Sequence, residues 1–247
     1  MLRSTGNSND TVGEMTLMKH LGELRTRIVR AAIAIALGSG VSMLFAEEII
    51  QVLIEPYGGY LQVLEPTEGI SVFLRVGLTC GVALASPIVL HQALSFVAPG
   101  LTNRERSALW MLVPGGMVLF VVGAVFAWFL MIPAAIDFLA NFMPNVFRVE
   151  WSSRGYVPFV LSLTLWIGVA FQMPLVLMFL ARLGLVTPTK LLNAWRGSVV
   201  GIAVVAAAIT PTVDPFNMML VMAPLVGLYA LSILLAIIPY RVRMRRE

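Results

Sequence analysis

Two long apolar runs meet at Phe96-Val-Ala-Pro-Gly-Leu-Thr-Asn-Arg-Glu105-Arg106, a short polar break. The proline and the glycine in this break end a helix, because proline lacks a backbone N–H and glycine costs about 1 kcal/mol relative to alanine. Thr102 or Asn103 can then cap the next helix, and Glu105 falls in its first turn, where the helix dipole favours a carboxylate. The break therefore predicts the end of one helix and the start of another. On this pattern alone, Phe96 and Glu105 could equally be an interface aromatic and a helix-terminal acid.

The apolar runs on either side of this break are typical of the whole chain. Of its 247 residues, 59% are hydrophobic and 12% are charged, and the mean hydropathy is +0.89, whereas a soluble domain is about 25% charged. The apolar stretches lack the alternation over about ten residues that marks the strands of a membrane barrel. The sequence therefore predicts an all-α integral membrane protein. Cys80 is the only cysteine, so an internal disulfide is excluded.

Six apolar segments are the candidate transmembrane helices, at residues 28–46, 71–95, 108–132, 156–180, 197–209 and 216–233. The last two are near or below the roughly 20 residues that cross a bilayer, so we expect the last two spans to be short. Apolar residues at helical spacing just before the first span predict a short interfacial helix that runs into it. We divide the chain into a disordered tail at 1–15, a single six-span membrane domain at 16–238 and a basic tail at 239–247.

Basic residues are distributed unequally between the two sides of these spans. Of the 17 Lys and Arg residues, all but Arg75, Arg148 and Arg154 fall in the tails and loops of one side. By the positive-inside rule, both termini and the break at Phe96 face the cytoplasm. Pro56 and Asp214 lie in connections on the outer side, where we expect structural roles.

Four motifs in this arrangement resemble those of the TatC family, the multi-spanning subunit of the twin-arginine (Sec-independent) protein translocase. They are His20-Leu-Gly-Glu23-Leu-Arg25, Phe96-Val-Ala-Pro99-Gly-Leu…Glu105-Arg106, Gly168-Val-Ala-Phe171-Gln172-Met-Pro174 and Thr210-Pro…Asp214.

The resemblance implies a cupped bundle of six helices in the cell (cytoplasmic) membrane. It also implies a receptor for the twin-arginine signal peptides of folded precursors, which are exported by the protonmotive force without a cofactor. The implied partners are small single-span Tat subunits of the TatA and TatB type, within a homo- or hetero-oligomer. The implied signal-peptide site consists of Glu23, Arg25, Phe96, Pro99, Leu101, Glu105 and Arg106.

The chemistry of this site suits a paired-arginine ligand. Guanidinium groups match carboxylates bidentately, and the predicted topology places Glu23 and Glu105 on the same membrane face. Exposed ion pairs are worth roughly 0–1 kcal/mol each, so apolar contact with Phe96 has to add affinity. For Glu23 an alternative stays open, namely an intrahelical ion pair with Arg27 four residues later.

Gln172 is the only strongly polar side chain in the middle of the fourth candidate span. Pro174, two residues later, frees the carbonyl of Ala170, so backbone and side-chain polarity meet at mid-membrane. Many members of the resembled family carry glutamate here, and an amide has no proton to exchange. We expect Gln172 and Pro174 to contact a partner subunit or a water-lined dent in the bilayer. The alternative is a hydrogen bond that packs helices within the chain.

Other classes of function find less support in the sequence. The two histidines are isolated, no Cys/His cluster suggests a metal site, and no phosphate loop or nucleophile arrangement is present, so we expect neither catalysis nor nucleic-acid binding. A small-solute secondary transporter would need several polar residues at the midplane and an inverted repeat, and only Gln172 fits. An intramembrane hydrolase would need a nucleophile and a base at membrane depth.

Overall fold

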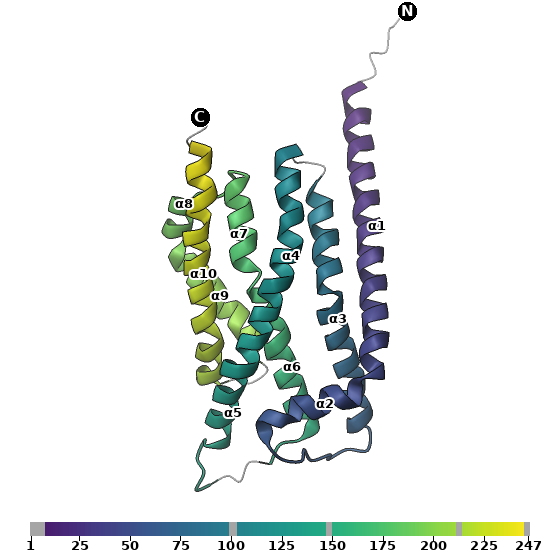
Figure 1. Ribbon diagram of the computed structural model, residues 1–247, viewed down its shortest axis with the longest axis vertical. Coiled ribbons are helices and arrows are strands. Elements are labelled where there is room, and N and C mark those ends of the chain that lie inside the picture. The colour runs from purple at the N-terminus through teal and green to yellow at the C-terminus, as the bar shows by residue number, and fades with distance from the viewer. Residues whose placement is uncertain (1–7, 99–102, 147–149, 211–213, 245–247) are drawn as a thin grey trace, which may run out of the picture.

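The computed structural model describes residues 8–98, 103–146, 150–210 and 214–244, of which residues 8–17, 19, 103–109, 111 and 238–244 are described by their backbone only. Helices make up most of this part of the chain, and it contains no strand beyond an isolated bridge between Gln62 and Ser152. In chain order (Figure 1) the elements are α1 (Ser8–Leu44), α2 (Ala46–Ile54), the 3₁₀ turn η1 (Glu55–Tyr57), α3 (Glu68–Val97), α4 (Asn103–Phe126), the π turn η3 (Ala127–Met131), α5 (Ile132–Ala140), α6 (Ser153–Ala170), α7 (Met173–Arg182), α8 (Pro188–Asn193), α9 (Trp195–Ile209) and α10 (Pro215–Met244).

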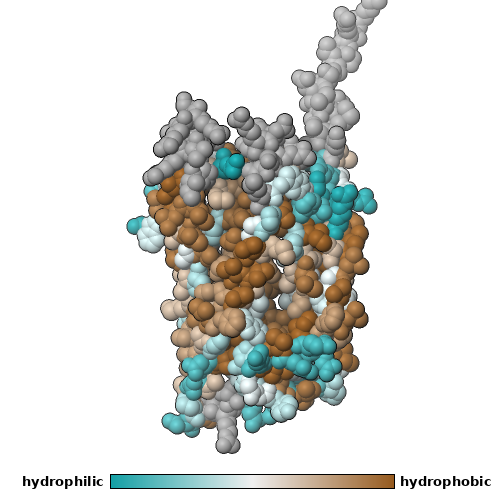
Figure 2. Space-filling view, in the orientation of Figure 1, coloured by the Kyte–Doolittle hydropathy of each residue, from teal (hydrophilic) through white to brown (hydrophobic). Residues whose placement is uncertain are grey.

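Five helical segments are long and apolar enough to cross a membrane, and one further apolar helix, α9, is shorter. The five are His20–Leu44, Glu68–Val97, Leu112–Ala140, Ser153–Arg182 and Pro215–Ile237. At most 33% of the apolar window of each is buried inside the protein, which leaves wide apolar faces for lipid to cover. Figure 2 shows these faces as a brown band between two more polar ends. The prediction of an all-α membrane protein with six spans is confirmed.

The prediction that the last two spans are both short is wrong for the last one. α9 has 15 residues, about 22 Å of helix against a hydrocarbon core of about 30 Å. The last apolar segment, in contrast, extends over the 23 residues Pro215–Ile237. Pro215 belongs to the first turn of α10, where its missing N–H is not needed, and the helix continues past Ile233.

The N-terminal part of the chain also differs from its prediction. α1 is one continuous helix of 37 residues, in which the predicted interfacial helix runs into the first span without a break. Residues 8–15, which we predicted to be disordered with the rest of 1–15, are its first turns, and residues 1–7 lie outside the described part. Gly22 is the one glycine between Met15 and Ile28, and a single glycine weakens a helix without ending it.

The third span is longer than predicted because Pro133 does not end it. Ile132 donates its N–H to the carbonyl of Ala127, five residues earlier, in the π turn η3. Such a wider turn accommodates a proline, whose missing N–H would interrupt a regular ladder. The apolar segment therefore runs to Ala140 instead of stopping at residue 132.

The bundle has two contrasting ends. The described starts of α1 and α4 and the ends of α3 and α10 lie at one end, which we call the open end (Figure 1). α2, η1, the loop at 58–67 and the described loop residues 141–146 and 150–152 lie at the opposite end, which we call the capped end. Between them, α6 supplies much of the core, since nine of its 18 residues are buried.

Hydrogen bonds between the two long loops close the capped end. The backbone of Gln62 donates to the carbonyl of Trp151 and accepts from the N–H of Ser153, both at 2.9 Å. Tyr57, Trp151 and Tyr156 form an aromatic cluster with ring centroids between 5.8 and 6.4 Å apart. Segments some 90 residues apart in the sequence are thus joined at this end.

Glu68 is the buried acid at the centre of the capped end, with 2% of its surface exposed. Its Oε1 accepts from the Ser153 hydroxyl at 2.8 Å and the Arg154 N–H at 2.6 Å. Its Oε2 accepts from the N–H groups of Leu64 and Glu65, at 2.8 and 3.3 Å. A buried carboxylate is tolerated when hydrogen bonds replace its hydration. Because its donors come from the loop at 58–67 and from the first turn of α6, Glu68 connects these two segments.

Candidate functional site

α1 and α3 meet at the open end through two aromatic rings. The imidazole of His20 stacks on the ring of Phe96, with centroids 4.3 Å apart and an interplanar angle of 26°. His20 is exposed, and Phe96, in the last turn of α3, is partly exposed. An aromatic surface is therefore accessible where the two helices touch.

Glu23 lies one turn further along α1 and forms an ion pair with Arg27. Two nitrogens of Arg27, Nη2 and Nε, donate to the same oxygen, Glu23 Oε1, at 2.6 and 3.1 Å. A third nitrogen, Nη1, donates to Gln92 Oε1 on α3 at 3.5 Å. The intrahelical pair that stayed open from the sequence is thus present. Within the described residues, the second oxygen of Glu23 accepts no hydrogen bond, and 30% of the side chain is exposed.

The structure describes only part of the remaining residues predicted for this site. α4 begins at Asn103, so the backbone of Glu105 and Arg106 lies in its first turn at the open end, as predicted. Their side chains, and all of Pro99 and Leu101, lie outside the described part. Arg25 is exposed on α1. The structure therefore brings Glu23, Phe96 and the start of α4 to the same end of the bundle.

Sequence reasoning missed two members of this cluster, His20 and Gln92. His20 is three residues before Glu23, on the same helical face, and this spacing could have pointed to it. Gln92 is four residues before Phe96, again on one face. The signal was incomplete because each spacing concerns one helix, whereas the cluster depends on how α1 packs against α3.

Gln172 lies where the fourth span breaks into α6 and α7. Its Nε2 donates to the carbonyl of Gly116 on α4 at 2.7 Å. A Cβ added at Gly116 would lie 2.3 Å from a methyl of Leu90 and 2.7 Å from Gln172 Oε1, so a larger residue there would make both side chains move. The acceptor for the Gln172 amide N–H therefore lies within the chain, which agrees with the alternative of a hydrogen bond that packs helices together. Oε1 is buried and has no partner among the described residues.

The break beside Gln172 follows from Pro174. Pro174 is in the first turn of α7, where its missing N–H is not needed, and it is almost fully buried. The N–H of Gln172 donates to Val169 three residues back, a tighter turn than in the regular helix. Backbone and side-chain polarity therefore meet here, as the sequence predicted.

Comparison with known proteins identifies the family. The family described as "Sec-independent protein translocase protein (TatC)" matches residues 19–224, which include most of the described helices. The chain belongs to the TatC family. The TatC motifs at His20–Arg25, at Phe96 and at Gln172 all fall within the matched residues.

Two TatC relatives indicate how far the likeness extends. TatCd of Bacillus subtilis (strain 168) is 37% identical over 234 residues, which cover 95% of this chain and 96% of that protein. The chloroplastic TATC of Pisum sativum is 39% identical over 224 residues, which cover 87% of this chain. The match spans 62% of the length of that chloroplast relative, so the likeness to it concerns a part.

A solved TatC structure shares the fold. The crystal structure of a twin arginine translocase receptor, TatC, is 34% identical and has a TM-score of 0.81. The alignment covers 89% of this chain and 99% of that one. The six-span architecture is therefore that of TatC.

Pro56 and Asp214, for which the sequence predicted structural roles, lie in the turn η1 and just before α10. Pro56 is partly buried in the turn η1. Asp214 precedes α10, where its Oδ1 accepts from the N–H of Asn217 at 2.7 Å and its Oδ2 from the Asn217 amide at 2.9 Å. This is the geometry of a helix cap, which satisfies free N–H groups at the start of α10.

Proposed function

We propose that this chain is the receptor subunit of a Sec-independent protein translocase and binds twin-arginine signal peptides at its open end. Membership of the TatC family supports this, as does the similarity to a crystallised twin arginine translocase receptor. The observation that carries the proposal is the partly exposed Phe96 ring, stacked on His20, at the same end of the bundle as Glu23, whose second oxygen accepts no hydrogen bond within the described residues.

The binding mode follows from the chemistry of the guanidinium group. One arginine of the peptide pairs with Glu105 at the start of α4, and the other reaches the unfilled oxygen of Glu23. An apolar residue next to the arginine pair packs on Phe96, whose ring is held by the stack with His20. Arg25, Pro99, Leu101 and Arg106 shape the rest of the surface. Glu23 thus keeps Arg27 as a partner and still accepts the ligand.

The setting of the receptor completes the proposal. The chain spans the cytoplasmic membrane as a single six-span domain, with the open end and both termini in the cytoplasm, by the positive-inside rule. It assembles with small single-span TatA- and TatB-type subunits, and the protonmotive force drives the export of folded precursors. The chain acts as a receptor and carries out no reaction itself.

The test is binding of a labelled twin-arginine signal peptide to the purified chain in lipid nanodiscs at physiological salt. We expect Glu105→Ala to weaken binding by roughly tenfold, the loss of a charge-assisted contact, and Glu105→Asp to retain part of it. A peptide with two lysines should bind the original chain more weakly, because an ammonium cannot form the bidentate pair. Glu48→Ala, which removes an exposed acid at the capped end, is the matched control. Undiminished binding by Glu105→Ala would remove Glu105 from the site.

A further inference from the structure

Arg75 lies near the capped end of α3 and has no counter-charge among the described residues. It lies seven residues after Glu68, at the start of this helix, which places it about 10 Å further along the axis. Its side chain is exposed and forms no ion pair or hydrogen bond with any residue in the described part of the chain. A charge at this depth is costly unless a partner of opposite sign neutralises it.

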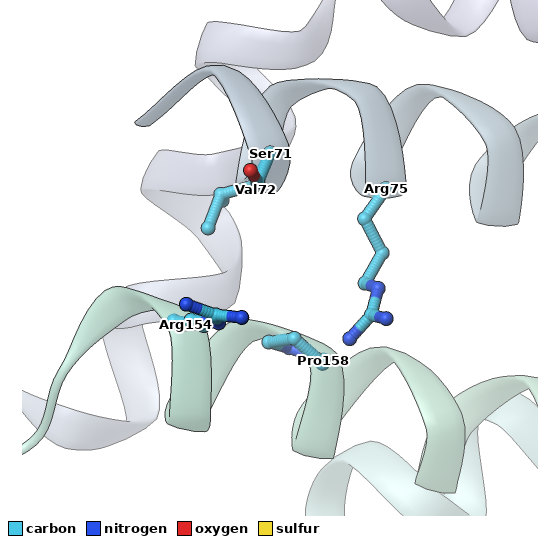
Figure 3. A pocket seen from close by; sticks show the side chains of 5 residues that line it. All are labelled: Ser71, Val72, Arg75, Arg154 and Pro158. Atoms are coloured by element: carbon cyan, nitrogen blue, oxygen red, sulfur yellow. The ribbon is translucent and has the colours of Figure 1, made fainter. Parts of the chain in front are cut away.

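A cavity of about 240 Å³ lies beside Arg75, between α3 and α6. Ser71, Val72 and Arg75 line it from α3, and Arg154 and Pro158 line it from α6. Figure 3 shows the Arg75 side chain extending from α3 toward α6, with the guanidinium of Arg154 on the same side of the gap as Pro158. At about 30 Å³ per water molecule in the liquid, the space admits a tetrahedral anion with part of its hydration.

Arg154 is held in place by the capped end, and its charge is already matched. Its Nη1 donates to Glu65 Oε2 at 2.6 Å, and its backbone N–H donates to Glu68. A guanidinium has five N–H donors, so several remain for a ligand. Glu68 has both oxygens occupied by four donors and cannot also neutralise Arg75. The cavity therefore combines Arg75, a cation that no described residue neutralises, with the remaining donors of Arg154.

We propose that this cavity binds the phosphate of a phospholipid headgroup. A guanidinium group binds two phosphate oxygens at once, and Arg75 supplies a positive charge that no described residue neutralises. Val72 and Pro158 offer apolar surface to the glycerol side of the lipid. The cavity opens near the end of two spans, where headgroup phosphates lie, so a lipid suits it better than a soluble anion. The site is at the opposite end from the proposed peptide site and does not depend on it.

The test is the thermal unfolding midpoint of the full-length chain in detergent micelles, because a ligand that binds only the folded protein raises it. Phosphatidylglycerol should raise the midpoint in proportion to its concentration. Diacylglycerol with the same acyl chains, which has no phosphate, should not. Arg75→Gln should fold normally, since the side chain has no described partner, and should need roughly five- to tenfold more phosphatidylglycerol for the same shift. Arg75→Lys keeps the charge but loses the forked guanidinium group, so the phosphatidylglycerol concentration that it needs should lie between those of the original chain and Arg75→Gln.

Arg30→Gln is the matched control, because it removes the charge of an exposed arginine on α1; it should leave the phosphatidylglycerol shift unchanged. Equal shifts for the original chain and Arg75→Gln would overturn the proposal, as would an equal effect of diacylglycerol. Inorganic phosphate should have little effect at the same concentration. If inorganic phosphate alone reproduced the whole shift, the lipid assignment would be wrong and the cavity would be a simple phosphate site.

Discussion

The two ends of this bundle treat their carboxylates in opposite ways. At the capped end, Glu68 is buried and its two oxygens accept four hydrogen bonds from one loop and the start of α6. At the open end, Glu23 is partly exposed and shares one oxygen with Arg27, while the other is unfilled within the described residues. A saturated acid stabilises the fold and has nothing left to offer a ligand. An unsaturated acid contributes less to folding and keeps the capacity to bind.

The largest effect we expect is an all-or-none difference in accessibility between these ends. In a Cys80→Ala background, a cysteine at Tyr60, which is 99% exposed at the capped end, should react in intact cells with a membrane-impermeant maleimide. A cysteine at Asn103, at the open end, should react only after the membrane is permeabilised. Reaction of both positions from the same side would contradict the six-span topology and the orientation derived from the basic residues.

The next largest effect concerns stability at the capped end. Glu68→Gln keeps the shape of the side chain but replaces one accepting oxygen by a donor that faces other donors, so buried N–H groups lose their partner. We expect the unfolding midpoint in micelles to fall by roughly 5–10 °C. Glu65→Gln is the control. That exposed acid forms one ion pair, with Arg154, so its replacement should lower the unfolding midpoint much less. An equal fall of the unfolding midpoint for the two variants would show that the buried hydrogen bonds of Glu68 do not hold the capped end together.

A smaller effect is expected at Gln172, between the two ends. Interhelical hydrogen bonds in membranes are worth about 0.6 kcal/mol on average, so Gln172→Leu should barely change the unfolding midpoint or peptide binding. It should impair crosslinking to the small partner subunits and export, because the buried Oε1 is the group left for a partner. Gln172→Glu should be tolerated, since a protonated acid can also donate to the carbonyl of Gly116. Normal assembly and export with Gln172→Leu would leave Gln172 with a packing role only.

Local sequence signals predicted the parts of the fold that depend on one segment at a time. Hydropathy located all six spans, and Pro99-Gly100 predicted that a new helix starts near Asn103. Pro174 predicted a disturbed backbone in the fourth span, and the structure divides that span there into α6 and α7. The length of the last span was underestimated because its apolar segment was ended at Ile233, whereas the helix continues beyond that residue.

Features that depend on distant segments could not be predicted. From the sequence, Glu68 was one of several acids in a polar loop; its burial depends on Ser153 and the N–H of Arg154, some 85 residues away. The stack of His20 on Phe96 likewise needs the packing of α1 against α3. For the candidate site, the sequence motifs predicted Glu23 and Phe96 together, but the ring that supports Phe96 came only from the structure.

The most direct test of the contrast between the ends is photocrosslinking with a short peptide that carries only the twin-arginine region. A photoreactive residue would replace Ala93, an exposed position one turn before Phe96, or Tyr60 at the capped end. We predict a strong crosslink from position 93 that is lost when the two arginines are changed to lysines, and none from position 60. A crosslink from position 60 that depends on the arginines, or one from position 93 that ignores them, would contradict the account.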